Sequence, residues 1–271
     1  MKKLIISSLT IAVIVSCSSS NDDTTNDNNT TPTPYLLKKV TETTDDGDTF
    51  ILEFKYNGDK ITESFSTTDD EKTVYTYSGD NIVKTEEFEG GKIRQVREFT
   101  YSNGKIASEK VTRTDFGTLV YTKNYQYVSD THVKFNEYKG STYNPSTGTY
   151  SNIEFAQVDA YLTNNGNVAS TNYTYHGTTY NVANTYDSSN HPMKNVKGYV
   201  KIDLFYLSDG ELSYNNLISR NEDYTGTVNG KNKTTAAHTF NNAAYPTKSV
   251  MTYTTSTFGT NIHTYNYEYN K

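Results

Sequence analysis

The sequence predicts an all-β fold built from successive antiparallel β-hairpins. Two observations carry this prediction: a composition rich in strand and turn formers, and a recurring alternation of apolar and polar residues. Tyrosine occurs 25 times and phenylalanine 11 times in 271 residues, while tryptophan is absent. Tyrosine, threonine and valine favour strands, and asparagine, glycine, aspartate and serine favour turns. Leucine and alanine, which favour helices, are scarce, so we expect little helix.

The alternation is organised into repeats. Four segments share a pattern of aromatic-x-Tyr, a turn of glycine, asparagine or aspartate, and then isoleucine or valine; they are residues 54–61, 75–82, 99–106 and, more loosely, 125–133. Their first residues follow one another at intervals of about 20–26 residues, within the range of structural repeats. The Asn-Gly pairs of the first and third segments favour the positive φ angles of tight hairpin turns. Each segment therefore predicts a strand, a turn and a second strand.

The predicted strands have one aromatic face and one polar face. Along residues 50–56 the even positions are aromatic or leucine, and the odd positions are polar apart from Ile51. Residues 97–101 and 121–127 show the same alternation. One packed face and one wet face are typical of an antiparallel meander. We therefore expect a meander of successive hairpins that forms a twisted or curled sheet.

Three tyrosines occupy equivalent places in these repeats. Tyr56, Tyr77 and Tyr101 each end the first strand of a hairpin on the aromatic face. Such residues can pack a half-buried face while the hydroxyl group reaches water at the edge. Sugars also stack on aromatic rings, so the same ladder could bind a glycan. We interpret the three tyrosines as core residues.

Residues 187–235 break the rhythm and predict an irregular insertion. Residues 194–205 favour either a short helix or an irregular strand, and residues 221–235 predict a polar loop. We expect this insertion to cover the aromatic face and to hold any binding site, because loops on a rigid scaffold carry function. Residues 248–253 and 261–269 then return as a closing hairpin.

The N-terminus has the form of a bacterial lipoprotein signal peptide. Lys2 and Lys3 precede an apolar run over residues 4–15, and Ser16 precedes Cys17, the only cysteine. A charged start, a short apolar core and a small residue before the cut are the parts of a secretory signal. The run of about 12 residues is shorter than the roughly 20 that a spanning helix needs. We therefore predict lipid attachment at Cys17. Several acyl chains on this residue would hold the protein stably at the membrane.

An ordinary secretory signal with a stray cysteine is the alternative, although an unpaired exported thiol would be unusual. The chain then divides into a signal peptide (1–16), a lipidated cysteine with a disordered tether (17–34), a repeat region (35–186), and the insertion and closing hairpins of the same domain (187–271). The tether has too few apolar side chains to order itself. Its residues 21–23 resemble the export signal of Bacteroidetes surface lipoproteins, or they are a plain solvated linker.

The hairpin repeats resemble the YD-repeat family, whose large members are the Rhs proteins, and in particular short outer-membrane lipoproteins of Bacteroidetes. The resemblance covers residues 36–186. Beyond it, residues 186–196 are similar to the Tyr-Asp … Asn-Pro-Phe-Lys-Asn segment of those lipoproteins, with His191 and Met193 where Asn and Phe are usual. Residues 240–247 are similar to their Tyr-x-Tyr-Asn … Gly-Tyr-Pro element. The resemblance implies a repeat-built β fold, and this chain has too few repeats to enclose anything large.

Catalytic and metal-binding patterns are missing from the sequence. The five histidines lack metal-ligand spacing; they are His132, His176, His191, His238 and His263. No nucleophile elbow, Walker loop or dinucleotide-binding glycine pattern occurs. The acidic stretches at 45–48 and 69–71 fall between strands and match no calcium-loop spacing, so we interpret them as solvated turns. We predict no catalytic residue, no metal and no cofactor.

Together these features predict a non-enzymatic, lipid-anchored binding or scaffold module of the outer membrane, on its periplasmic face or at the cell surface. Its expected partners are the membrane and either a glycan or an envelope protein. A formal net charge of −6 argues against a nucleic-acid partner.

Two other classes stay open, a polysaccharide-processing hydrolase or its accessory subunit, and a carrier of apolar molecules. Two carboxylates about 5–10 Å apart in a cleft would favour the hydrolase. An open apolar concavity would favour the carrier, and a covered face with shallow pockets would favour the scaffold.

Overall fold

A computed structural model describes residues 34–115, 117–205, 213–257 and 259–271. Residues Pro34–Lys271 form one compact unit. The predicted signal peptide, Cys17 and nearly all of the predicted tether lie outside the described residues.

The described residues form sixteen strands and one short helix. The first nine strands comprise one leading strand and four hairpins, and the four hairpins contain the four sequence repeats, as predicted. The nine strands are β1 (Leu37–Thr44), β2 (Thr49–Asn57), β3 (Lys60–Ser66), β4 (Glu71–Ser78), β5 (Asn81–Glu89), β6 (Lys92–Ser102), β7 (Lys105–Arg113), β8 (Leu119–Ser129) and β9 (His132–Asn144).

The second half of the chain continues the same sheet. It contains β10 (Thr149–Leu162), β11 (Val168–Tyr175), β12 (Thr178–Tyr186), α1 (Tyr199–Asp203), β13 (Leu217–Gly226), β14 (Gly230–Phe240), β15 (Pro246–Thr255) and β16 (Gly259–Tyr269). The predicted closing hairpin is confirmed as β15 and β16, whose strands pair from Lys248 opposite Asn266 to Thr255 opposite Gly259.

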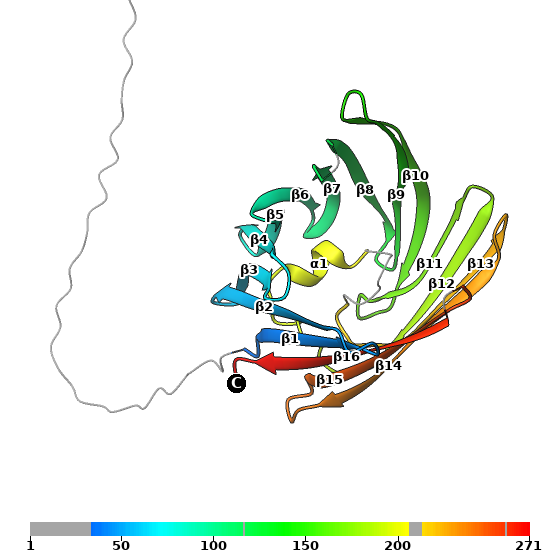
Figure 1. Ribbon diagram of the computed structural model, residues 1–271. Helices are drawn as coiled ribbons and strands as arrows, with labels where there is room; N and C mark the ends of the chain where they lie inside the picture. Colours follow the sequence, from blue (N-terminus) through cyan, green and yellow to red (C-terminus); the bar gives the residue numbers. More distant parts are fainter. Residues whose placement is uncertain (1–33, 116, 206–212, 258) are drawn as a thin grey trace, which may run out of the picture. The chain divides into compact units, whose positions relative to one another are not determined.

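The sheet closes into a barrel, and the expected open, curled sheet is therefore wrong. Every strand pairs antiparallel with its neighbours in sequence, and β16 returns to pair with β1 (Figure 1). In the closing pair Val40 lies opposite Tyr267, and Lys39 forms a 2.7 Å ion pair with Glu268. Closure leaves no unpaired edge, which is the usual solution for a sheet of this length.

The inner face of the barrel carries the core. Buried isoleucines, phenylalanines and valines of the strands pack there against the segment that follows β12, which contributes Met193, Val196, Ile202 and Phe205. Figure 1 shows α1 inside the ring of strands. The prediction that this segment includes a short helix and covers the aromatic face is confirmed.

Helix α1 begins where the chain passes very close to the barrel wall. Gly198 precedes the helix with a φ of 71°. A Cβ atom at this position would lie 2.9 Å from the carbonyl oxygen of Asp80, a contact that real Cβ atoms do not make. Glycine meets both demands, because it lacks a side chain and adopts left-handed conformations at little cost.

The predicted polar loop at 221–235 is wrong, since these residues form most of the β13–β14 hairpin. Arg220 lies opposite Thr234 and Glu222 opposite Asn232 in this pair. Both faces of the hairpin carry polar side chains here, so the sequence shows no alternation between apolar and polar positions. Cross-strand hydrogen bonding still supports the strands, as in the 3.1 Å bond from the Asn232 amide to Glu222.

Polar cross-strand pairs are frequent on the outer face of the sheet. Cross-strand partners there include Lys55 with Glu63 at 2.7 Å and Lys110 with Glu98 at 3.1 Å. Hydroxyl pairs such as Thr100 and Ser108, 2.7 Å apart, continue the pattern. Within the described part of the chain, no helix is long and apolar enough to cross a membrane.

Candidate functional site

An apolar cavity of about 390 Å³ opens on the inner face beside the closing strands. Its walls come from β1, β2, β15 and β16, and from the segment between β12 and β13. The apolar residues that line it are Leu37, Val40, Phe50, Ile51, Leu52, Phe54, Pro192, Met193, Leu217 and Met251, joined by Tyr199, Tyr265 and Tyr267. Cavities of this size and composition are typical of sites for small molecules.

Along β2, the exposed fraction of the side chains that line the cavity increases toward its opening. Phe54 is 9% exposed, Leu52 is 38% exposed and Phe50 is 43% exposed, although all three face the cavity. Large apolar side chains that stay exposed inside a concavity are informative, since burying them would be favourable. The barrel therefore exposes apolar surface on its inner side.

Cross-strand rows order the wall of the cavity. In the inner row, Val40 of β1 lies directly between Leu52 of β2 and Tyr267 of β16. In the next row outward, Glu42 lies directly between Phe50 and Tyr265. Paired residues on one face of a sheet have Cβ atoms about 4.5–5.5 Å apart, so each row is continuous.

Glu42 is the charged group of the outer row. Its Oε1 atom lies 2.5 Å from Nδ1 of His263 and accepts a 3.1 Å hydrogen bond from the Tyr265 hydroxyl group. These two contacts, from residues more than two hundred positions away in the sequence, fix the orientation of the carboxylate. Asp69 and Glu71 also line the cavity, from the turn between β3 and β4 and the start of β4.

A second polar pair lies deeper. The Nε2 atom of His238 is 2.8 Å from the Leu217 carbonyl oxygen, and its Nδ1 atom is 2.7 Å from the Ser249 hydroxyl. A carbonyl oxygen only accepts hydrogen bonds, so Nε2 carries a proton and donates it to Leu217. Ser249 is 2% exposed. The pair satisfies buried polar groups between β14 and β15, which is a structural task.

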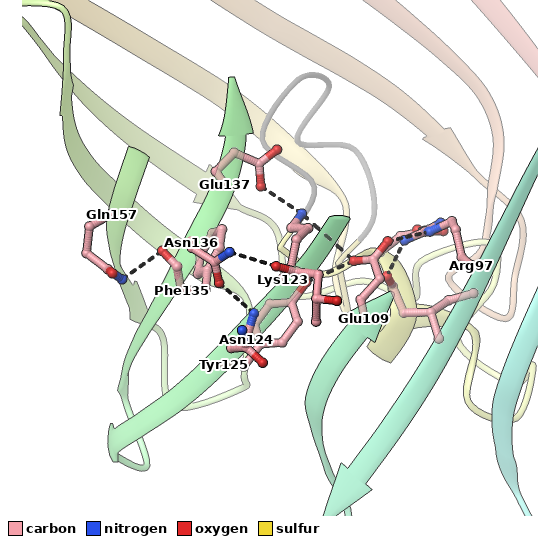
Figure 2. Close-up of polar contacts among 12 residues, drawn as sticks. Arg97, Glu109, Lys123, Asn124, Tyr125, Phe135, Asn136, Glu137 and Gln157 are labelled. Atoms are coloured by element: carbon pink, nitrogen blue, oxygen red, sulfur yellow. Dashed lines mark hydrogen bonds and ion pairs between the residues drawn. The ribbon is translucent and has the colours of Figure 1, made fainter. Parts of the chain in front are cut away.

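A network of buried charges lies on the other side of the barrel interior. Figure 2 shows Arg97 beside Glu109, and Lys123 between Glu109 and Glu137. Arg97 donates to Glu109 at 2.7 Å and to Asp203 of α1 at 2.6 Å. Lys123 forms a 2.7 Å ion pair with Glu137. The network therefore ties the helix to the barrel wall.

The charges in this network neutralise one another. Burial alone would raise the pKa of Glu109, but Arg97, Lys123 and the hydrogen bonds from Arg97 and Tyr125 outweigh it and hold that pKa below its ordinary value. An ionised carboxylate that is held by cations on two sides suits a structural role. It lacks the raised pKa that a general acid would need.

His191 and His238 line the cavity and His263 contacts Glu42 in its wall, whereas the other two histidines lie elsewhere. His132 contacts Asp159 at 2.6 Å, His176 contacts Glu154 at 3.0 Å, and His191 Nδ1 accepts a 3.2 Å hydrogen bond from the Met193 amide. No group of three or more potential metal ligands occurs among the residues that the structure describes. The predictions that the chain has no metal, cofactor or catalytic residue stay predictions, as does lipid attachment at Cys17.

Sequence reasoning missed the residues that shape both sites. Glu42, Asp203 and His263 follow no motif, and their partners are distant along the chain. Arg97 and Lys123 did leave a signal, because each occupies a position on the aromatic face of its predicted strand. A charged residue at an inward position predicts a buried ion pair, although its partner cannot be identified from one strand.

Comparisons with known proteins identify no family for this chain. No family model matches it, and no curated protein matches it. Among solved structures, a porin-like protein from Bacteroides vulgatus ATCC 8482 is 15% identical, with a TM-score of 0.48 over 88% of this chain and 99% of that chain. A porin-like protein from Bacteroides uniformis ATCC 8492 is 11% identical, with a TM-score of 0.43 over 88% and 97% of the two chains. At TM-scores below 0.5, these likenesses do not establish a shared function.

Proposed function

We propose that this chain is a lipid-anchored envelope protein whose barrel binds a small apolar molecule without chemically changing it. The observation that carries the proposal is the open cavity of about 390 Å³ with Phe50 and Leu52 exposed inside it. Of the classes that the sequence left open, an apolar concavity favours the carrier. Glu109 and Asp203 are both held by Arg97, so this buried pair is not the free carboxylate pair that a hydrolase would need.

The anchoring half of the proposal rests on the signal-like N-terminus and on the polar pairs of the outer face. A barrel that crosses a bilayer carries an apolar band on its outer surface. Here Lys55, Glu98 and Lys110 are more than half exposed on that surface. A water-exposed barrel held by acyl chains on Cys17 agrees with both features, at the outer membrane on its periplasmic face or at the cell surface.

A glycan ligand has less support than an apolar one. Tyrosine rings inside the barrel stack on one another, as Tyr173 does on Tyr180 with centroids 4.7 Å apart and Tyr180 does on Tyr224 at 5.7 Å. A ring whose face is covered by its neighbour offers little surface to a sugar. The exposed rings and chains of the cavity are instead those of phenylalanine and leucine.

Binding is tested with N-phenyl-1-naphthylamine, a neutral apolar fluorophore, on residues 17–271 carrying Cys17→Ser so that no acyl chain competes. We expect saturable fluorescence enhancement. Leu52→Lys should weaken binding by about tenfold or more, because an ammonium group in an apolar cavity is costly to desolvate.

The matched control is Val120→Lys, since Val120 is a similarly exposed residue, at 41% against 38% for Leu52, and does not line the cavity. It should bind the fluorophore like the parent. Equal binding by all three proteins, or no saturable binding at all, would contradict the proposed function.

Anchoring is tested separately by labelling cells with a fatty-acid probe. The wild-type chain should incorporate the probe and Cys17→Ser should not, because the thiol of Cys17 is the predicted site of attachment. Labelling of equal strength in the two proteins would refute lipid attachment at this residue.

A further inference from the structure

We infer that the cavity takes an apolar molecule with a cationic end, held against Glu42 between the rings of Phe50 and Tyr265. The inference rests on the proposed function, that the cavity binds a small molecule, and it narrows that function to one ligand class. It comes from the order of the two rows on the cavity wall, apolar inside and charged outside.

The inner row and the core beneath it fit the apolar part of such a molecule. Val40, Leu52 and Tyr267 form one row across three strands, and Leu37 and Phe54 lie deeper, at 2% and 9% exposure. Burial of a ligand's methylene groups on such a surface is favourable.

The outer row fits a cation. Glu42 lies directly opposite Phe50 on one side and Tyr265 on the other, and all three line the cavity. Aromatic faces attract ammonium groups, and they do so more strongly where water is partly excluded. A carboxylate flanked by two rings therefore offers charge pairing and ring contacts to the same group.

The contacts of Glu42 leave it able to act in this way. His263 and the Tyr265 hydroxyl group both contact Oε1, so they orient the carboxylate from one side. A ligand ammonium group can pair with Oε2 without displacing either contact. The site is thus oriented before the ligand arrives, which lowers the cost of binding.

The remaining charges of the cavity act in the same direction. Besides Glu42, the lining includes Asp69, Glu71 and the histidines His191 and His238, and no lysine or arginine is among the described residues that line it. Glu71 is partly offset by Arg94, 3.1 Å away. A carboxylate-bearing molecule would place like charges together in a partly apolar site, where their repulsion is strong.

The test compares three ligands with one decyl chain: decyltrimethylammonium, decanol and decanoate. Each displaces N-phenyl-1-naphthylamine from residues 17–271 carrying Cys17→Ser, below its critical micelle concentration. We expect the ammonium compound to bind about tenfold more tightly than decanol and decanoate to bind most weakly.

Two variants test whether Glu42 and Phe50 of the outer row cause the preference for the ammonium compound. Glu42→Gln should remove most of the advantage of the ammonium compound while leaving decanol affinity nearly unchanged, which also shows that the cavity is intact. Phe50→Leu should reduce the advantage in part. The control Glu63→Gln, which alters a glutamate paired with Lys55 on the outer face, should leave it unchanged.

The outcomes separate the two proposals. If decanol or decanoate binds as tightly as the ammonium compound, or if Glu42→Gln keeps the full cation preference, the ligand class is wrong while the apolar site stands. If none of the three compounds displaces the fluorophore, or the fluorophore does not bind, the apolar site itself is refuted, and the ligand class with it.

Discussion

In three of the hairpin repeats, one tyrosine hydroxyl group forms a hydrogen bond with the backbone of another segment. The Tyr56 hydroxyl donates to the Leu37 carbonyl oxygen at 2.6 Å, and the Tyr101 hydroxyl donates to that of Ile82 at 2.6 Å. Tyr77 accepts from the Ile61 amide at 3.2 Å and donates to the Lys197 carbonyl oxygen at 2.9 Å. Their rings pack against the core, as the sequence predicted. Their hydroxyl groups form hydrogen bonds with backbone atoms, and such partners cannot be predicted from the pattern of side chains.

The ring and the hydroxyl group of Tyr101 should contribute separately to stability. Tyr101→Phe removes the hydrogen bond and should cost about 1 kcal/mol. Tyr101→Ala should cost about 2–4 kcal/mol, somewhat below the ~3–5 kcal/mol of a fully buried aromatic residue.

Urea unfolding measures both values. Tyr161, which is 46% exposed and stacks on His132, provides the surface control, and Tyr161→Ala should cost less than about 1.5 kcal/mol. A loss for Tyr101→Ala as small as that of the control would overturn the packing role and revive a ligand platform.

Buried tyrosines should also limit stability in alkali. Burial raises the pKa of Tyr75 from 10.0 in a free side chain to about 12. The unfolded chain therefore loses this proton before the folded chain does, so the stabilisation is complete below pH 10 and is lost as pH rises toward 12.

Tyr75→Phe should flatten the fall in unfolding free energy between these two pH values, as measured by urea unfolding at each pH. The same slope in the variant and the parent would show that Tyr75 does not contribute to it. Other buried tyrosines with raised pKa values, such as Tyr186, leave a residual slope in both proteins.

At the scale of elements, α1 depends on the barrel wall for its position. A helix of five residues is too short to be stable alone. Arg97 of β6 holds it through the Asp203 carboxylate and the Ile202 carbonyl oxygen, at 2.6 and 2.8 Å. The side chain of Arg97 is only 11% exposed, so these contacts are poorly screened by water.

Arg97→Met should therefore cost about 3–5 kcal/mol in urea unfolding, because it leaves Glu109 and Asp203 without their shared cation. Arg113→Met is the matched control, since Arg113 forms an exposed ion pair with Asp115 and such pairs contribute about 0–1 kcal/mol. Losses of similar size in the two variants would contradict a network that holds the helix.

Elements built from local alternation could be predicted, and the others could not. Residues 50–56 and 97–101 revealed strands because their inward side chains are mostly aromatic. The β13–β14 hairpin has Arg220, Glu222 and Tyr224 in equivalent places, which gave no apolar period to detect. Where the inside of the barrel is polar, the sequence signal of a strand weakens.

For the whole molecule, the closed topology and the cavity lay beyond sequence reasoning. Both depend on the pairing of β1 with β16, and the sequence of neither strand indicates this distant partner. Glu42 and His263, which meet in the cavity wall, are 221 residues apart. The sequence did locate the segment that covers the inner face, because the break in the repeat rhythm after β12 is visible without knowing the topology.

The central claim is that the barrel interior holds an apolar molecule beside the closing strands. A crystal structure of the barrel with a terminally brominated decyltrimethylammonium tests it most directly, because the anomalous signal of bromine locates the chain end. We predict a single strong peak among Val40, Leu52 and Met193. A peak on the outer face, or none at saturating ligand, would contradict the account.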